Sequence, residues 1–224
     1  CAWSSDVCSS DLGSFNERFG MPAAGSVLLT PVRFPFTTDL QTFDGERGSL
    51  LQRYRPAEQP KIIFSNTAVE YWGGGRAAAL IHASPDGMRD LPVPDNVRIY
   101  FLAGTQHEQS AFPPRQARGQ QRDNPVPQRE VFRALLAGFH QWITRDVAPP
   151  PSRDPRLADW SLTRLAAVLF PTIPGVADPR TIAGPGQVRE GRVTRLPHLV
   201  PQGDADGNDL GGIRVPDVSV PMRS

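Results

Sequence analysis

Lysine is almost absent from this chain. Lys61 is the only lysine among the 24 basic Lys and Arg residues, and 23 acidic residues bring the formal net charge to +1 at pH 7. A near-neutral chain of this kind gives no sign of binding nucleic acid or an acidic lipid surface. We therefore expect no nucleic-acid partner.

Long apolar runs are missing as well. No stretch comes near the roughly 20 apolar residues that span a bilayer, so the sequence predicts no membrane span. The chain opens with neither an initiating Met nor a signal peptide. Because we expect the natural N-terminus to lie upstream, periplasmic, secreted and cytoplasmic locations all remain open.

Cysteine occurs only at positions 1 and 8, in an opening segment that repeats Ser-Ser-Asp at 4–6 and 9–11. The segment has no helical or strand periodicity. It resembles translated sequencing-adapter sequence fused to a gene fragment, so we treat residues 1–12 as a non-native tail. A disordered Ser-rich terminus is the alternative interpretation. The rest of the chain has no cysteine, which excludes disulfides and thiol nucleophiles there.

Metal-binding motifs are also lacking, because none of the four histidines has the spacing of zinc ligands. Residues 204–209 begin like a calcium loop, but Asp209 stands at the glycine position and Val215 at the position of the bidentate glutamate. We predict a turn there, flanked by extended arms at 192–200 and 212–220. No metal and no cofactor are expected.

Two short apolar runs, Lys61–Phe64 and Val97–Leu102, stand out in what remains. Their β-branched and aromatic residues predict strands that are buried on both faces. Short helices are predicted over 47–55 and 70–81, and a long amphipathic helix over 128–147. Helices thus alternate with strands, which favours an α/β fold with a parallel sheet and helices on its faces.

Two parallel strands do not make a stable open sheet by themselves. We therefore expect the other strands to lie upstream, and residues 13–148 to be a partial α/β domain containing the last two strands and their flanking helices. Proline and glycine are frequent after Ala148. Residues 149–224 are predicted to form a Pro/Gly-rich, partly β extension that packs on the same domain.

Each predicted strand is followed by a residue suited to acid–base chemistry, Glu70 after the first and His107 after the second. In open α/β sheets, ligands bind beyond the carboxyl ends of the strands. A neutral imidazole can take a proton from a hydroxyl, and a carboxylate on its other nitrogen fixes the tautomer. Alternatively, His107 is a hydrogen-bonded loop histidine and Glu70 a helix N-terminal carboxylate that interacts with the helix dipole.

Six segments resemble, in this order, a little-characterised α/β-hydrolase family of bacterial proteins. They are Gly13–Asn16, Asn66–Trp72, Ser84–Gly87, Ala103–His107, Ala148–Ser152 and Asp204–Asn208. The resemblance implies that Glu70 is the acid and His107 the base of a catalytic triad that acts on a carboxylic ester, a small-molecule substrate. Tyr71 and Trp72, beside Glu70, are expected either to line the substrate pocket or to pack beneath the site.

The nucleophilic serine of that family lies on a strand-to-helix elbow before the Gly13–Asn16 segment, and this chain contains no Gly-x-Ser-x-Gly pattern. We therefore expect a Ser–Glu–His triad whose serine lies upstream, and no turnover by these 224 residues alone. Two alternatives remain open. One is an acyltransferase with the same triad, and the other is a non-catalytic binding or interaction module, which the Pro-rich C-terminal region and the missing elbow would suit.

Overall fold

The computed structural model describes residues 30–32, 34–72, 77–107, 109–116, 122–176, 178–181, 184–189 and 192–220. The predicted tail at 1–12 and the Gly13–Asn16 segment lie outside these ranges.

Nine strands and several short helices make up the described part of the chain, with one long helix among them. The strands are β1 (Thr30–Pro31), β2 (Gln41–Phe43), β3 (Glu46–Gly48), β4 (Ile62–Thr67), β5 (Val97–Leu102), β6 (Leu162–Arg164), β7 (Pro185–Arg189), β8 (Arg192–Arg195) and β9 (Leu199–Pro201). The α-helices are α2 (Ala68–Trp72), α3 (Arg129–Arg145) and α4 (Pro216–Ser219). The 3-10 helices are η1 (Pro56–Glu58), η2 (Ala78–Ile81), η3 (Leu165–Ala167) and η4 (Pro179–Thr181).

Strands β4 and β5 lie side by side and run parallel, in register from Ile62 opposite Val97 to Thr67 opposite Leu102. This confirms the predicted parallel pair. All of β5 except Arg98 is buried, whereas β4 is buried only toward its carboxyl end. The pair therefore brings two carboxyl ends, and the segments that follow them, to one edge.

The other side of β5 is also occupied, by two single residues far along the chain. Arg153 donates its backbone N–H to Ile99 O at 2.8 Å and accepts from Phe101 N at 2.8 Å. Ile213 donates to Phe101 O at 2.7 Å and accepts from Ala103 N at 3.0 Å. Within the described ranges, β5 is thus the centre of the parallel arrangement, and β4 has β5 as its only strand partner.

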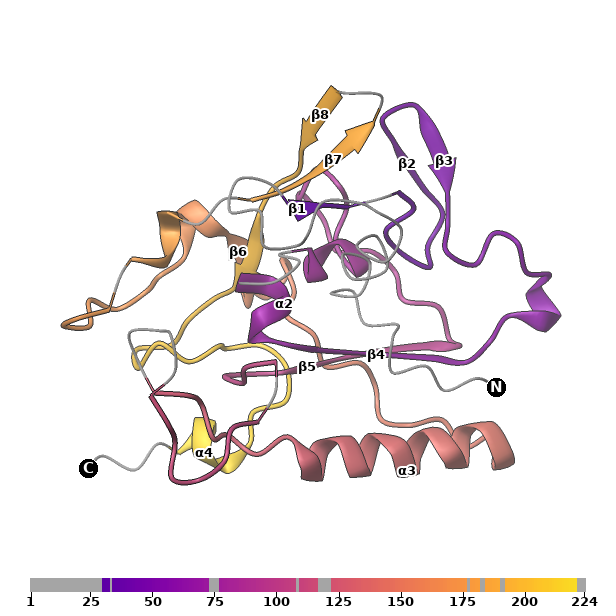
Figure 1. Ribbon diagram of the computed structural model, residues 1–224. Coiled ribbons are helices and arrows are strands. Elements are labelled where there is room, and N and C mark those ends of the chain that lie inside the picture. The colour runs from indigo at the N-terminus through magenta and orange to yellow at the C-terminus, as the bar shows by residue number, and fades with distance from the viewer. Residues whose placement is uncertain are drawn as a thin grey trace.

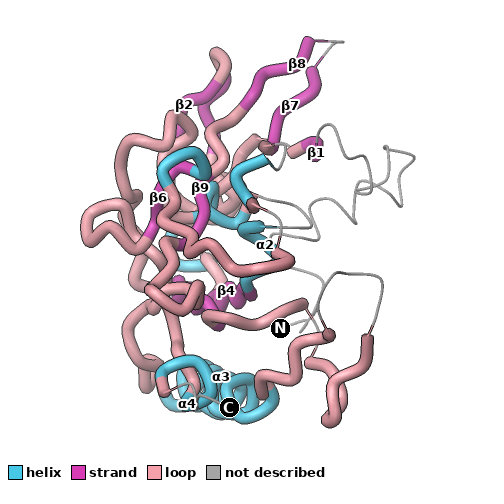
Figure 2. The backbone as a smooth tube through the Cα atoms, turned by 90° about the vertical axis from the view of Figure 1, so that its left-hand side faces the viewer, coloured by secondary structure: helices cyan, strands magenta, loops and turns pink. Residues whose placement is uncertain are grey.

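Helix α3 lies on one side of the β4–β5 pair, and the other small sheets, β1–β7–β8, β2–β3 and β6–β9, lie on the other (Figures 1 and 2). The long amphipathic helix predicted from the sequence is confirmed. Lys61 ties it to the start of β4, donating to Trp142 O at 2.6 Å and to Asp146 Oδ1 at 2.5 Å. The Trp142 ring is buried and lies against Lys61 and against the guanidinium of Arg98.

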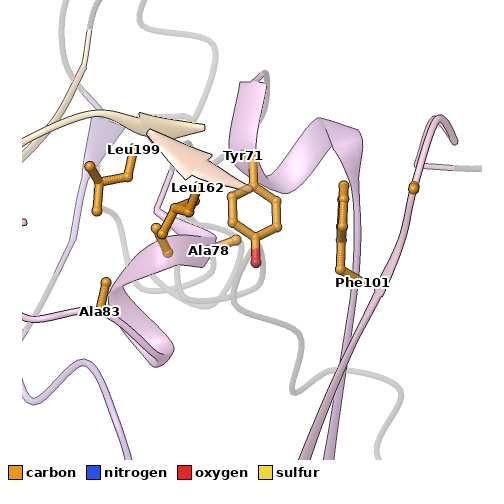
Figure 3. Packing of buried hydrophobic residues seen from close by; sticks show 8 residues of the cluster. Tyr71, Ala78, Ala83, Phe101, Leu162 and Leu199 are labelled. Atoms are coloured by element: carbon orange, nitrogen blue, oxygen red, sulfur yellow. The ribbon is translucent and has the colours of Figure 1, made fainter. Parts of the chain in front are cut away.

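The main core forms between α2, β5 and the last third of the chain. The Tyr71 ring stands between Leu162 and Phe101, as Figure 3 shows. Its centroid is 5.0 Å from that of Phe101 in an edge-to-face arrangement, a geometry that aromatic pairs favour. Leu162 and Leu199 complete the cluster, so residues after 148 help to bury the helix that carries Glu70.

The helix predicted over 47–55 is wrong. Residues 41–48 form a β2–β3 hairpin, and the segment after it continues in turns. Asp44 and Gly45 have φ of 51° and 78°, the pair of positive values that a tight two-residue hairpin turn requires. Asp-Gly is a strong sequence signal for that turn, and the hairpin it closes takes up residues 47 and 48 of the predicted helix, while residues 50–53 form turns.

The prediction over 70–81 is only partly right. Helix α2 ends at Trp72, and the 3-10 helix η2 follows as a separate element, with residues 73–76 outside the described ranges. By contrast, the turn at Ser84–Gly87 is confirmed, since Gly87 N donates to Ser84 O at 2.8 Å.

The turn at 204–209 is confirmed, but its flanking arms are arranged differently from the prediction. In the first arm, β8 pairs with β7 and β9 pairs with β6. The second arm leaves the turn to join β5 through Ile213 and ends in helix α4. The proline residues in both arms limit their pairing, which explains why they form no long hairpin together.

In the part of the chain that the structure describes, no helix combines the length and the apolar character needed to cross a membrane.

Candidate active site

Glu70 lies in the first turn of α2, directly after the carboxyl end of β4. Its side chain is only 3% exposed. Oε2 accepts two hydrogen bonds from Thr67, from the backbone N and from Oγ1, each at 2.6 Å. The bond to the backbone N is the glutamate half of a capping box, in which a Glu three residues into a helix returns to the backbone N–H of the residue that caps it. One carboxylate oxygen is therefore fixed by the start of the helix.

The second oxygen of Glu70 faces the histidine. His107 Nδ1 lies 2.8 Å from Glu70 Oε1. A carboxylate can only accept, so Nδ1 carries a hydrogen, and in the neutral form of the imidazole Nε2 has the lone pair. The imidazole side chain is 56% exposed, in contrast to the buried carboxylate. The structure thus brings together the two residues that the sequence singled out as acid and base.

The loop from Leu102 to His107 is held on several sides. Gly104 has φ of 66°, which favours glycine, and a Cβ there would meet Val218 at 2.9 Å. Thr105 Oγ1 donates to Leu102 O at 2.6 Å, and Thr105 O accepts from Ala68 N at 3.0 Å. The last of these bonds joins the loop directly to the start of α2.

Asn124 and Gln128, on the segment that leads into α3, add further contacts. Asn124 Nδ2 donates to Gly104 O at 2.7 Å, and Asn124 N donates to Gln106 Oε1 at 3.0 Å. Gln128, just before α3, donates to Gln106 O at 2.5 Å. The segment just before α3 therefore supports the segment that carries His107.

A cavity of about 500 Å³ opens beside the pair. Its walls are formed mainly by α2, the His107 loop and two later segments. The lining residues are Ala68, Val69, Trp72, Gly104, Thr105, Gln106, Asn124, Phe170, Pro179, Gly207, Asn208 and Asp209. Trp72, one of the two predicted substrate-binding residues, thus lies in the wall of a cavity next to the Glu70–His107 pair.

Asp209 joins the two sides of this cavity. Its Oδ2 accepts from Gly104 N at 2.8 Å and its Oδ1 from the indole Nε1 of Trp72 at 3.3 Å. The side chain is buried, and this burial raises the pKa of its carboxyl group. Asp209 therefore connects the loop of His107 to the end of the helix that carries Glu70.

Tyr71, the other predicted substrate-binding residue, does not line the cavity. Its side chain is fully buried, and its hydroxyl lies 2.8 Å from His82 Nε2. His82 is itself fully buried, with Nδ1 3.4 Å from Asp154 Oδ2. Burial lowers the pKa of His82 to about 3, so this imidazole is neutral. These positions favour a packing role for Tyr71 beneath the site.

The 204–209 turn is internally bonded. Asp204 Oδ1 accepts from the backbone N of Asp206 and of Asn208, and Oδ2 accepts from Arg214 at 2.5 Å. Among the described residues, no group of three or more His, Cys, Asp or Glu side chains could hold a metal ion.

Several residues of the site were not predicted from the sequence. Thr67 could have been found, because Thr67-x-x-Glu70 matches the pattern of a capping box. Asn124 and Asp209 have no such local signal, since each forms its hydrogen bonds with residues that are distant in the sequence.

Comparison with known families agrees with this architecture. The family model described as an alpha/beta hydrolase domain matches residues 38–224, which include every residue of the candidate site. Searches among curated proteins and among solved structures found no match. Because the family match extends over most of its length, the chain belongs to the alpha/beta hydrolase domain family.

Proposed function

We propose that Glu70 and His107 are the acid and base of a Ser–Glu–His triad that hydrolyses a carboxylic ester. The supporting observation is the 2.8 Å hydrogen bond between His107 Nδ1 and Glu70 Oε1, on a carboxylate whose other oxygen is held by Thr67. A buried, oriented carboxylate behind an exposed imidazole is the arrangement that a general base requires.

In the proposed reaction, Nε2 of His107 takes the proton of the serine hydroxyl while the serine oxygen attacks the ester carbonyl. The imidazolium then gives this proton to the departing alcohol. Water attacks the acyl-enzyme with the same base, and carboxylic acid is released as the serine regains its proton. Glu70 keeps the hydrogen on Nδ1 and stabilises the imidazolium throughout.

We assign the serine to the sequence that precedes residue 13 in the gene, because residues 13–224 contain no Gly-x-Ser-x-Gly pattern. Trp72 is assigned to the substrate pocket because it lines the cavity beside the pair. Tyr71 is not assigned to it, since its side chain is enclosed in the core.

The triad is tested by measuring hydrolysis of a p-nitrophenyl ester by the protein that the full reading frame encodes. His107→Ala should lower kcat by at least about 10⁴-fold, since the base and the nucleophile act as a unit. Glu70→Gln should lower it by about 10²–10⁴-fold, because the amide can hold the wrong tautomer. His140→Ala is the matched control, as His140 is an exposed histidine on α3. Turnover by His107→Ala at the rate of His140→Ala would refute the proposal.

A further inference from the structure

The cavity beside the pair has the size and the walls of a small-molecule site. Its volume of about 500 Å³ lies within the range of such sites. Apolar side chains form much of the lining, among them Val69, Trp72 and Phe170. The polar edge of Trp72 is already used, because its N–H is bound to Asp209, and the remaining ring surface is apolar.

The described lining of the cavity has an acidic side chain but no basic one. Asp209 is the one ionisable side chain among the described lining residues, which include no Lys, Arg or His. Its two oxygens already accept from Gly104 and Trp72. Arg214, whose positive charge acts on Asp209, is itself ion-paired with Asp204 at 2.5 Å. Among the described residues, no cation lines the cavity to replace the hydration that an anionic group would lose there.

The position of the cavity relates it to the reaction. Val69 precedes Glu70 in the chain, Gln106 precedes His107, and both line the cavity. A substrate group bound in the cavity would therefore place the ester to which it is attached close to the imidazole.

We propose that this cavity is a subsite for a neutral, bulky apolar group of the ester, of the size of a phenyl ring or a branched alkyl chain, and that it rejects an anionic group. This inference rests on the proposed function for its link to catalysis. Phe170 and Trp72 provide the apolar walls, and Asp209 provides the selection against negative charge while it holds Trp72 in place.

The test uses two ligands of the same size that differ in charge, 3-phenylpropanamide and 3-phenylpropionate. Saturation-transfer difference NMR on the 224-residue chain measures binding of each without any turnover. The amide should bind with a Kd of about the millimolar range, and the carboxylate about tenfold more weakly. Asp209→Asn should narrow this difference, because it removes the negative charge.

Two substitutions at one wall position keep the test independent of folding effects. Phe170→Ala removes the wall and Phe170→Trp fills the cavity, so each should weaken amide binding by about fivefold or more. Leu169→Ala is the matched control, since Leu169 is the neighbouring residue, is 72% exposed and does not line the cavity. It should leave binding of the amide unchanged.

Equal affinity for the two ligands, unchanged binding in both Phe170 variants, or no saturable binding of the amide would each overturn the subsite. These outcomes are separate from those for the triad. If His107→Ala abolishes hydrolysis while the chain shows no selective binding, only the subsite fails. If the amide binds selectively while His107→Ala retains turnover, only the triad fails.

Discussion

Glu70 has both of the roles that the sequence offered as alternatives, a carboxylate at the start of a helix and the partner of a histidine. As a helix N-terminal carboxylate, it bonds the N–H and the hydroxyl of Thr67 through Oε2. As a partner of histidine, it accepts from His107 through Oε1. A free glutamate has three side-chain torsions, and anchoring one oxygen to the helix start removes most of that freedom. The capping box is therefore a way to aim the other oxygen at the imidazole.

Removing the Thr67 hydroxyl tests how much its bond to Glu70 stabilises the fold. In Thr67→Val, the backbone N–H still holds Oε2, but the buried carboxylate loses its bond from the hydroxyl, so we expect a loss of about 1 kcal/mol in the free energy of unfolding. Urea unfolding monitored by tryptophan fluorescence measures it. Thr144→Val is the control, because that exposed hydroxyl bonds His140 O within α3. Equal stability of the two variants would contradict a stabilising role for the Thr67 hydroxyl.

The candidate pair could be predicted from the sequence because each member follows a recognisable apolar strand. Asp209 could not be, although it bonds both Trp72 and Gly104. It lies 137 residues from the first and 105 from the second, and nothing local in an Asp/Gly-rich turn distinguishes an acid that faces inward from one that faces solvent. Such contacts depend on the fold of the whole chain.

At the scale of elements, β4, β5 and the long helix α3 were the predictable part. β5 and α3 are confirmed close to their predicted ends, because a buried strand and an amphipathic helix each carry a clear apolar period. The helix predicted over 47–55 is wrong, because the hairpin closed at Asp44–Gly45 extends to residue 48 and the weak apolar pattern after it lies in turns. Short elements contain too few residues for periodicity to decide between the two.

A buried polar network connects three of these elements. Tyr71 on α2 bonds His82 at the end of η2, and His82 faces Asp154 on the segment beside β5. Arg156 completes it, bonding Asp154 Oδ2 at 3.0 Å. Because His82 is fully buried and its pKa is lowered to about 3, protonation favours the unfolded chain, in which a histidine has a pKa of about 6.5.

This pKa predicts an acid sensitivity of the fold. Between about pH 6.5 and pH 3 the unfolded state binds one proton more at His82, so the free energy of unfolding should fall by up to about 1.4 kcal/mol for each unit of decreasing pH. Above pH 6.5 both states are neutral and the contribution is constant. Urea unfolding at several pH values should show a steeper decline in the natural chain than in His82→Gln.

The carboxyl group of Asp154 has the opposite effect on the pH dependence of the free energy of unfolding. Burial raises the pKa of the Asp154 carboxyl group in the folded state. Protonation of Asp154 therefore stabilises the folded state as the pH falls toward the ordinary pKa of an aspartic acid. Comparing the natural chain with His82→Gln cancels much of this effect, because both retain Asp154. His140→Gln, at an exposed position, should keep the full decline. An identical decline in His82→Gln would show that His82 is not the titrating group.

At the scale of the whole molecule, β5 gathers segments from distant parts of the chain. It pairs with β4 on one side, and with Arg153 and Ile213 on the other. The candidate site lies where β5 ends, so its geometry depends on residues that come more than 100 positions after His107. The family match, which runs from residue 38 to 224, includes all of these segments.

Gly212 is the point at which the C-terminal segment reaches β5. It has φ of 84°, and a Cβ there would meet Phe101 O at 2.4 Å and the Phe101 ring at 2.5 Å. Phe101 is fully buried in the main core, so neither atom can move away easily. Gly212→Ala should therefore lower the free energy of unfolding by about 3 kcal/mol or more, from backbone strain and overpacking together.

Gly175 offers a matched control for this prediction. Its φ of 77° is almost the same, but a Cβ there would meet nothing within 4 Å. Gly175→Ala should cost only the strain of the left-handed backbone, about 1 kcal/mol. Urea unfolding of the two variants thus isolates the contact with Phe101. Ala103, two residues after Phe101, also bonds Ile213. A shift of the 212–213 backbone away from β5 should therefore also move the loop that carries His107. If the two variants unfold at the same urea concentration, the C-terminal segment does not pack against β5 in this way.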